Sequence, residues 1–254
     1  MFRKVLFFGG TAISGIVIYN NFDISNCYKT AWSLTFDPIA PIKKWNYNWD
    51  GFNNDNSIKS KAVRHLILIR HGQYVYKDTD SQCKLTLLGR QQAKYTGLRL
   101  NELNITFDRL VHSTMTRAVE TANIIKEHNP AITMVNDPDL VEGTPYVNEP
   151  FLPHWVIAED VIKVDNSRIE KVFRKYFYRA PLEQEKDSYE ILVCHANVIR
   201  YMLCRALQFP PEGWIRFSLD HASMSWVSIK PNGSVTVRSI GNSGYMPPDK
   251  ISVS

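Results

Sequence analysis

Residues 65–72, HLILIRHG, constrain the fold more than any other stretch of the chain. Residues 66–69 form an unbroken apolar run, which is typical of a strand buried on both faces. The run ends at Arg70, His71 and Gly72. In an open α/β sheet, ligands bind in the crevice beyond the carboxyl ends of the strands, and a glycine allows a sharp turn there. The stretch therefore favours an anion site at a strand end, although an isolated RHG is more often only a solvated strand end.

The chain from residue 61 onward alternates strand patterns with helix patterns. The buried strands are expected at 66–69, 109–112 and 190–195, and the helices at 87–102, from Ser113 or Thr114 to about Pro130, at 165–177 and at 197–207. The turn PNGS at 231–234 predicts a hairpin between two final strands. Within the helix at 87–102, capped by Thr86, the spacing favours Leu88, Tyr95 and Leu98 as the buried face. The fold class is α/β, with a mostly parallel central sheet flanked by helices.

Composition limits the number of domains and the classes of partner. With 254 residues, 44% of them hydrophobic, the chain suits one catalytic domain, residues 61–254, plus appendages. The net charge of +5 is dispersed rather than gathered into a basic stripe, which argues against nucleic acid and mildly favours phosphorylated partners. The four cysteines show no CxxC spacing. We expect no disulfide, no metal site and no cofactor.

The N-terminal 22 residues predict a membrane anchor. Arg3 and Lys4 precede fifteen uncharged residues, 5–19, which as a helix would extend roughly 22 Å against the ~30 Å hydrocarbon core of a bilayer. A cleaved targeting segment is the first alternative, and a plain buried helix is the second.

Residues 23–60 have the composition of an extended linker. They contain Pro38, Pro41 and the polar string NNDNS, without sustained periodicity. Within the linker, residues 45–50 carry alternating aromatic side chains in the stretch KWNYNWD. Aromatic side chains on a solvated tether are usually covered. Either a partner covers them, or they pack on the catalytic domain of their own chain.

Three chemically active side chains are expected to converge on one crevice. His71 follows one strand, Arg117 opens the helix after another, and His195 ends a third. Helix N-termini at the same edge attract anions, so phosphate is the natural occupant. Nucleophilic attack requires a neutral His71, which the charges of Arg70 and Arg117 favour. Glu142, in the loop DLVEGTP, is the candidate proton donor to the leaving oxygen, although an isolated acid is more often solvated.

Taken together, five motifs resemble those of the histidine phosphatase (phosphoglycerate mutase-like) superfamily. They are RHG at 70–72, LTLLGRQQA at 85–93, HSTMTRAVETA at 112–122, VEGTP at 141–145 and CHANVIR at 194–200. Within that superfamily, KWNYNWD, DSYEILVCHANVIRYMLCRALQFPPEGW and GYMPPDKIS are similar to a mitochondrial serine/threonine protein phosphatase. The resemblance runs from about residue 45 to the C-terminus and implies a phosphoglycerate mutase-like fold.

The resemblance also implies a role for each motif residue. His71 would attack phosphorus to give a phosphohistidine, with Glu142 as the proton donor. The phosphoryl group would be held by Arg70, Arg117 and His195, and Asn197 is a further candidate for phosphate contact.

The function that this implies is that of a metal-independent phosphatase of phosphoserine and phosphothreonine proteins, tethered to a mitochondrial membrane through residues 5–19. The aromatic motif would build a homo-oligomer through Trp45 and Trp49. The family reads W-D-x-N-W-D there, whereas this chain has Asn46 in place of the first aspartate. A small-molecule phosphatase or phosphoglycerate mutase, and a membrane-tethered scaffold with a vestigial pocket, are the alternatives.

A rival centre consists of Asp78 and Asp80, which resemble the paired aspartates of haloacid-dehalogenase phosphatases. The stretch before them is no buried strand, and Gln82 stands where threonine or valine is expected. We therefore expect these aspartates in a solvated loop. The remaining histidines are expected to be surface or structural residues, with His112 at a strand end behind the pocket; they are His65, His112, His128, His154 and His221.

Overall fold

Six strands form the central sheet of the described residues, which are 44–52 and 60–253 of the computed structural model. The strands are β1 (Arg64–Arg70), β2 (Arg109–Ser113), β3 (Met134–Asp137), β4 (Ser188–Cys194), β5 (Met224–Ile229) and β6 (Val235–Asn242). Their order across the sheet is β3-β2-β4-β1-β5-β6. The first four pair in parallel, whereas β5 and β6 are antiparallel. The mostly parallel sheet and its C-terminal hairpin are as the sequence predicts.

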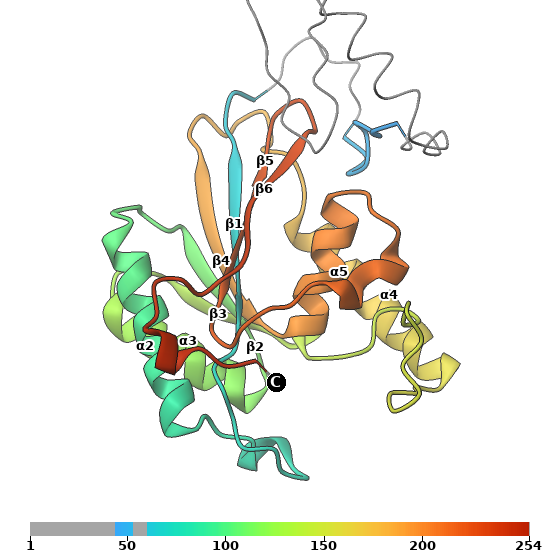
Figure 1. Ribbon diagram of the computed structural model, residues 1–254. Coiled ribbons are helices and arrows are strands. Elements are labelled where there is room, and N and C mark those ends of the chain that lie inside the picture. The colour runs from blue at the N-terminus through green and yellow to red at the C-terminus, as the bar shows by residue number, and fades with distance from the viewer. Residues whose placement is uncertain (1–43, 53–59, 254) are drawn as a thin grey trace, which may run out of the picture. The chain divides into compact units, whose positions relative to one another are not determined.

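Helices cover both faces of the sheet. They are α2 (Leu87–Glu102), α3 (Thr116–His128), α4 (Glu159–Tyr176) and α5 (Ala196–Ala206). Figure 1 shows α2 and α3 on one side of the strands and α4 and α5 on the other. The expected membrane segment and most of the linker lie outside the described residues. Within the described residues, no helix has the length and apolar character needed to cross a membrane.

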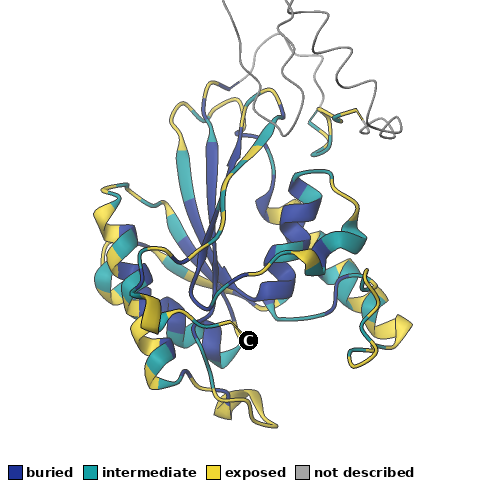
Figure 2. Cartoon of the chain, viewed as in Figure 1, coloured by how far each residue is buried: buried dark blue, intermediate teal, exposed yellow. Residues whose placement is uncertain are grey.

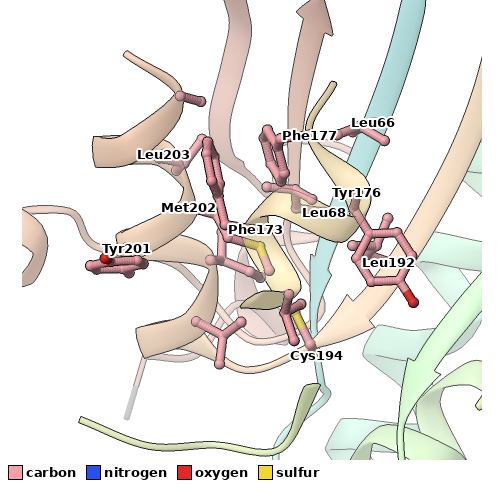
Figure 3. Packing of buried hydrophobic residues seen from close by; sticks show 14 of the residues in the cluster. Leu66, Leu68, Phe173, Tyr176, Phe177, Leu192, Cys194, Tyr201, Met202 and Leu203 are labelled. Carbon is pink, nitrogen blue, oxygen red and sulfur yellow. The ribbon is translucent and has the colours of Figure 1, made fainter. Parts of the chain in front are cut away.

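The strands β1 and β4 divide the core into two layers. Along β1, Leu66 and Leu68 face the cluster under α4 and α5, while Ile67 and Ile69 face the cluster under α2 and α3. Successive side chains of a strand point to opposite faces, so an unbroken apolar run is what a strand covered on both sides requires. Strand β1 is accordingly buried along its whole length, whereas the edge strands β3 and β6 are partly exposed (Figure 2). In the first layer, Phe173 and Phe177 stack with ring centroids 4.6 Å apart (Figure 3).

The buried face of α2 differs from the predicted one. Leu98 is exposed, and apart from Leu100 the face toward the protein consists of small and polar residues: Gly89, Gln92, Ala93, Thr96 and Gly97. Close packing explains why small residues occupy this face, because a Cβ added to Gly89 would lie 1.9 Å from the carbonyl oxygen of Gln73. Helix α2 approaches the loop after β1 too closely for large side chains.

Two helix starts also differ from the sequence-based prediction. Helix α4 begins at Glu159, six residues before the predicted start at 165. Helix α3 begins at Thr116, and its N-cap residue, Met115, makes no side-chain capping hydrogen bond. Instead, the Thr116 amide donates to the Asp80 carboxylate at 3.0 Å, across 36 positions of sequence. Capping rules that consider only neighbouring residues cannot predict a cap that a distant segment supplies.

Candidate active site

The carboxyl ends of β1, β2 and β4 meet at one edge of the sheet. In the β1/β4 ladder Arg70 pairs with Cys194, and the His71 amide continues it by donating to the Cys194 carbonyl at 3.0 Å. The rings of His71 and His195 lie 5.2 Å apart, centroid to centroid, and both side chains are buried. The two histidines that the sequence singles out therefore share one site.

Hydrogen bonds fix the tautomer of His71. Its Nδ1 atom lies 2.9 Å from the carbonyl oxygen of Gly72, which can only accept, so Nδ1 carries the proton. Nε2 accepts from Arg117 Nε at 3.2 Å and thus holds a lone pair. Burial, then the neighbouring His195, Arg117 and Arg70, hold the pKa of His71 well below its usual range. Neutral at physiological pH, His71 presents Nε2 as a nucleophile.

Arg117 is fixed on three sides at the start of α3. Besides donating to His71, its guanidinium lies over the Tyr74 ring at 4.6 Å and faces the Asp80 carboxylate at 3.7 Å. Contact with an aromatic face and a carboxylate orients a guanidinium without removing its charge. The charge is therefore held beside the nucleophile before any anion arrives.

His195 is the N-cap residue of α5, and one of its ring nitrogens has no partner. Nε2 lies 2.9 Å from the Ser113 hydroxyl, which also accepts from the Met115 amide at 3.3 Å. Because Ser113 already accepts one proton, its own hydroxyl proton is available to His195 Nε2. When Ser113 donates to Nε2, the proton of His195 resides on Nδ1, a buried atom without a hydrogen-bond partner. A buried unpaired donor beside the nucleophile suits a phosphoryl oxygen.

Arg70 has a second unpaired donor. Its two terminal nitrogens donate to the Leu219 carbonyl at 2.6 Å and to His221 Nε2 at 3.1 Å, while its buried Nε has no partner. Burial lowers the pKa of Arg70 to about 10, opposed by the nearby Glu142 carboxyl, so the group stays charged at neutral pH. His221, expected to be a surface or structural residue, is buried with its ring centroid 5.9 Å from that of His71.

Glu142 lies at the opening of the same site, on the loop after β3. Burial raises the pKa of its carboxyl above the usual value, although the Gly143 amide at 3.2 Å and then Arg117 and Arg70 oppose the shift. A raised pKa keeps the proton on the acid to higher pH, as a general acid requires. Asn197 supports this loop, because its amide donates to the Gly143 carbonyl at 3.0 Å.

A cleft of about 530 Å³ leads to the site. Its lining includes the candidate site residues Arg117 and Glu142, together with Asn197, Tyr76 and Trp155. The Tyr76 side chain is exposed. Among the described residues, no group of three His, Cys, Asp or Glu side chains is arranged to hold a metal ion.

Asp78 and Asp80 belong to the exposed loop that was expected for them. Asp80 opens a short 3-10 helix, Asp80–Gln82, and accepts hydrogen bonds from the amide and hydroxyl of Thr116 at 3.0 and 2.9 Å. Its carboxylate is thus bound to the N-terminus of α3 rather than presented as a nucleophile. The sequence did not predict that Asp80, Ser113 and His221 contact site residues, because these contacts join segments that are far apart in the chain.

The aromatic motif packs on the catalytic domain of its own chain. The indole N–H groups of Trp45 and Trp49 both donate to the carbonyl oxygen of Gly233, at 3.2 and 2.8 Å. Asp50 pairs with Arg179, and although burial raises the pKa of this carboxyl, the hydrogen bonds from Arg179 lower it overall. The Asn46 side-chain oxygen accepts from the Asn48 amide at 2.9 Å, a turn contact that needs no charge. The charged contact of the motif is made by Asp50.

Comparison with protein families gives one match over most of the chain. Residues 66–144 and 159–242 match the histidine phosphatase superfamily (branch 1). These ranges contain all five residues assigned to the site, from Arg70 to His195.

Curated relatives are similar over most of their length. The chain is 52% identical over 194 residues to the mouse protein named serine/threonine-protein phosphatase PGAM5, mitochondrial, covering 76% of this chain and 67% of that protein. It is 45% and 44% identical to the proteins of the same name from Drosophila persimilis and Caenorhabditis elegans, covering 85% and 86% of this chain and 83% and 84% of theirs.

Solved structures show the same fold. A phosphoglycerate mutase from Plasmodium falciparum is 33% identical with a TM-score of 0.53, over 76% of this chain and 98% of that one. A phosphoglycerate mutase from Bacillus anthracis, 18% identical with a TM-score of 0.56 over 73% and 96% of the chains, is similar in fold alone.

Proposed function

This chain belongs to the histidine phosphatase superfamily, and we propose that it is a mitochondrial serine/threonine protein phosphatase acting through a phosphohistidine on His71. The relatives that match most of the chain carry that name. The observation that supports the chemistry is the tautomer of His71: Nδ1–H is held by the Gly72 carbonyl while Nε2 keeps a lone pair beside Arg117.

The reaction proceeds in two transfers. In the first, His71 Nε2 attacks phosphorus, the bond from phosphorus to the seryl or threonyl oxygen breaks, and Glu142 gives its proton to that oxygen. In the second, water attacks the phosphohistidine, the P–N bond breaks, and the Glu142 carboxylate takes the proton from water. Inorganic phosphate leaves, and His71 returns to its neutral state.

Positive charge around the phosphoryl oxygens stabilises both transition states. Arg70 Nε and His195 Nδ1 are buried donors without partners, and Arg117 exchanges its contact with His71 for a phosphoryl oxygen. The site thus obtains its positive charge from arginine and histidine, so turnover should survive EDTA. Loss of activity in EDTA would argue for a metal-dependent reaction.

Rapid quench with a radiolabelled phosphoserine peptide tests the intermediate. Label should appear on the protein as an acid-labile, base-stable phosphoramidate and should be absent from His71→Ala. Label on a serine, or normal turnover by His71→Ala, would refute the covalent role of His71.

A small-molecule phosphatase or mutase on the same fold is the second candidate, favoured by the 33% identity to the Plasmodium phosphoglycerate mutase. The cleft lining includes the aromatic side chains Tyr76 and Trp155, which residues flanking a phosphoserine could contact. We expect turnover of phosphopeptides to exceed turnover of 2,3-bisphosphoglycerate. The reverse order would favour the second candidate, and no turnover of either would favour a scaffold.

We further propose that residues 1–22 anchor the protein in a mitochondrial membrane through residues 5–19. The support is the uncharged segment after Arg3 and Lys4, together with the mitochondrial names of the relatives. Extraction of mitochondrial membranes with alkaline carbonate should leave the full chain in the pellet, and a chain starting at residue 23 in the supernatant. Release of the full chain would contradict the anchor.

The motif around Trp45 and Trp49, which contacts its own catalytic domain in the described chain, is proposed to build a homo-oligomer by exchange, so that the acceptor formed by Gly233 and Arg179 binds the motif of a neighbouring copy. The support is the chemistry of that acceptor: a carbonyl that takes two indole N–H groups and an arginine that pairs with Asp50.

A further inference from the structure

Ser252, near the C-terminus, forms hydrogen bonds with His221. The His221 amide donates to the Ser252 carbonyl at 2.9 Å, and His221 Nδ1 lies 3.1 Å from that carbonyl and 2.9 Å from the Ser252 hydroxyl. Ser252 follows a short 3-10 helix, Pro248–Lys250, and the C-terminus lies at the end of the sheet where β1 ends (Figure 1). The C-terminal segment, residues 250–253, therefore reaches the edge of the sheet that carries the active site.

The same imidazole holds Arg70. Since the Ser252 carbonyl can only accept, Nδ1 carries the proton of His221, and Nε2 is left as an acceptor for the Arg70 guanidinium at 3.1 Å. Burial, and then Arg70, lower the pKa of His221 to about 4, so the ring is neutral and keeps that acceptor. Ser252, His221 and Arg70 thus form a directed series of hydrogen bonds.

An independent contact ties the C-terminal segment to the loop after Arg70 and His71. The fully buried side chain of Gln92 donates to the Lys250 carbonyl and the Ser252 hydroxyl, both at 2.8 Å. Its oxygen accepts from the Gln73 amide at 2.9 Å. Gln92 belongs to the motif LTLLGRQQA at 85–93.

We propose that the C-terminal segment is a positioning element of the active site, and that His221 is the positioning residue through which it fixes Arg70. The inference rests on the proposed role of Arg70 in holding the phosphoryl group. With one terminal nitrogen on the Leu219 carbonyl and the other on His221, the guanidinium is held in one orientation, in which its unpaired Nε–H is a donor available to phosphate. Without the acceptor on His221, the guanidinium rotates and that donor is no longer held in place.

The first experiment compares His221→Phe with His221→Gln in the full chain. Phenylalanine keeps the ring but removes both nitrogens, whereas the glutamine amide oxygen can reach the guanidinium. Inorganic phosphate binding by calorimetry and inhibition by vanadate should weaken about tenfold in His221→Phe, and His221→Gln should recover part of this loss. Deletion of residues 251–254 should weaken both as well, while Asp249→Asn, an exposed neighbour, should change neither.

The second experiment places His221→Phe in an Arg70→Ala background. If His221 acts through Arg70, the double variant binds phosphate as weakly as Arg70→Ala alone. Additive losses, or unchanged phosphate binding in both His221→Phe and the deletion, would overturn the inference. If circular dichroism shows that His221→Phe does not fold, phosphate binding is compared instead for His221→Gln and for the deletion, each with Arg70 and with Arg70→Ala. Unchanged phosphate binding in Arg70→Ala would instead refute the proposed role of Arg70.

Discussion

His71 can attack phosphorus only while its Nε2 atom holds a lone pair. The Gly72 carbonyl fixes the proton on Nδ1, and burial together with positive neighbours prevents a second proton from binding. Arg117 donates to the same lone pair at 3.2 Å, so the nucleophile becomes free when an anion draws the guanidinium away. In the proposed mechanism, binding of the phosphorylated substrate therefore also frees the Nε2 lone pair of His71.

Glu142 and Arg117 should differ in their dependence on the leaving group. A general acid matters most for a poor leaving group, so Glu142→Gln should slow phosphoserine hydrolysis at least tenfold more than hydrolysis of an aryl phosphate, whose oxygen departs without a proton. Arg117→Ala should slow both substrates alike, because both develop the same charge on phosphorus. Steady-state kinetics on the two substrates measure this difference. An equal loss of rate with both substrates in Glu142→Gln would mean that another residue donates the proton.

The pH profile should reflect the shifted pKa values of the same groups. Burial raises the pKa of Glu142 above its ordinary value, so the proton donor is present below this raised pKa and is lost as pH rises through it. The pKa of His71 is lowered well below 6.5, so the nucleophile is lost only as pH falls through that low value. For a phosphoserine peptide, kcat/KM should decline as pH rises through the raised pKa of Glu142, and on the acid side only as pH falls through the low pKa of His71. Glu142→Gln should remove the alkaline decline; an unchanged profile would contradict the assignment.

At the scale of elements, the N-terminus of α3 depends on a loop from another part of the chain. Asp80 accepts from the Thr116 amide and hydroxyl and faces Arg117, so one carboxylate both caps the helix and orients the arginine on its first turn. A negative charge is also favourable at a helix N-terminus.

Asp80→Ala should therefore destabilise the fold by about 1 kcal/mol, the usual cost of losing a capping side chain. Asp80→Asn keeps an acceptor for the Thr116 amide and should cost less. Urea denaturation of the two variants measures the difference. Asp78→Ala, two positions away in the same exposed loop, is the matched control and should leave stability unchanged. Equal loss in the two alanine variants would show that the cap contributes nothing.

At the scale of the whole molecule, the proposed oligomer depends on the contact between the aromatic motif and Gly233. Gly233 has a φ of +83°, and a Cβ there would lie 2.4 Å from the Tyr47 carbonyl oxygen. Only glycine lets the motif approach the acceptor closely enough for both indole N–H groups to bind its carbonyl.

Light scattering should show Trp49→Ala, Gly233→Ala and a chain starting at residue 61 to be smaller than a chain starting near residue 30. The fragment from residue 61 should also be less active on a phosphoserine peptide, and a free peptide of residues 40–55 should restore part of that activity. Gly244→Ala, whose added Cβ makes only an ordinary contact at 3.5 Å, is the control. An unchanged mass would mean that the motif packs within its own chain, whereas a smaller but fully active particle would separate assembly from catalysis.

The sequence by itself determined the parts of this protein that depend on local pattern. The apolar run at 66–69 had to be a strand buried on both faces, the Asn-Gly turn at 232–233 had to close a hairpin, and the ends of parallel strands had to bring His71, Arg117 and His195 to one edge. The placement of these residues follows from alternation and periodicity, which act between near neighbours in the chain.

Only the tertiary structure decided the contacts that tune the site. The Asp80 cap, the Ser113 bond to His195 and the attachment of Arg70 to His221 join residues 36, 82 and 151 positions apart. The buried face of α2 followed from how closely it approaches Gln73, not from the hydrophobicity of its own residues. Hydrogen bonds and steric fit between distant segments depend on geometry within a few tenths of an ångström, and no periodicity in the chain encodes that geometry.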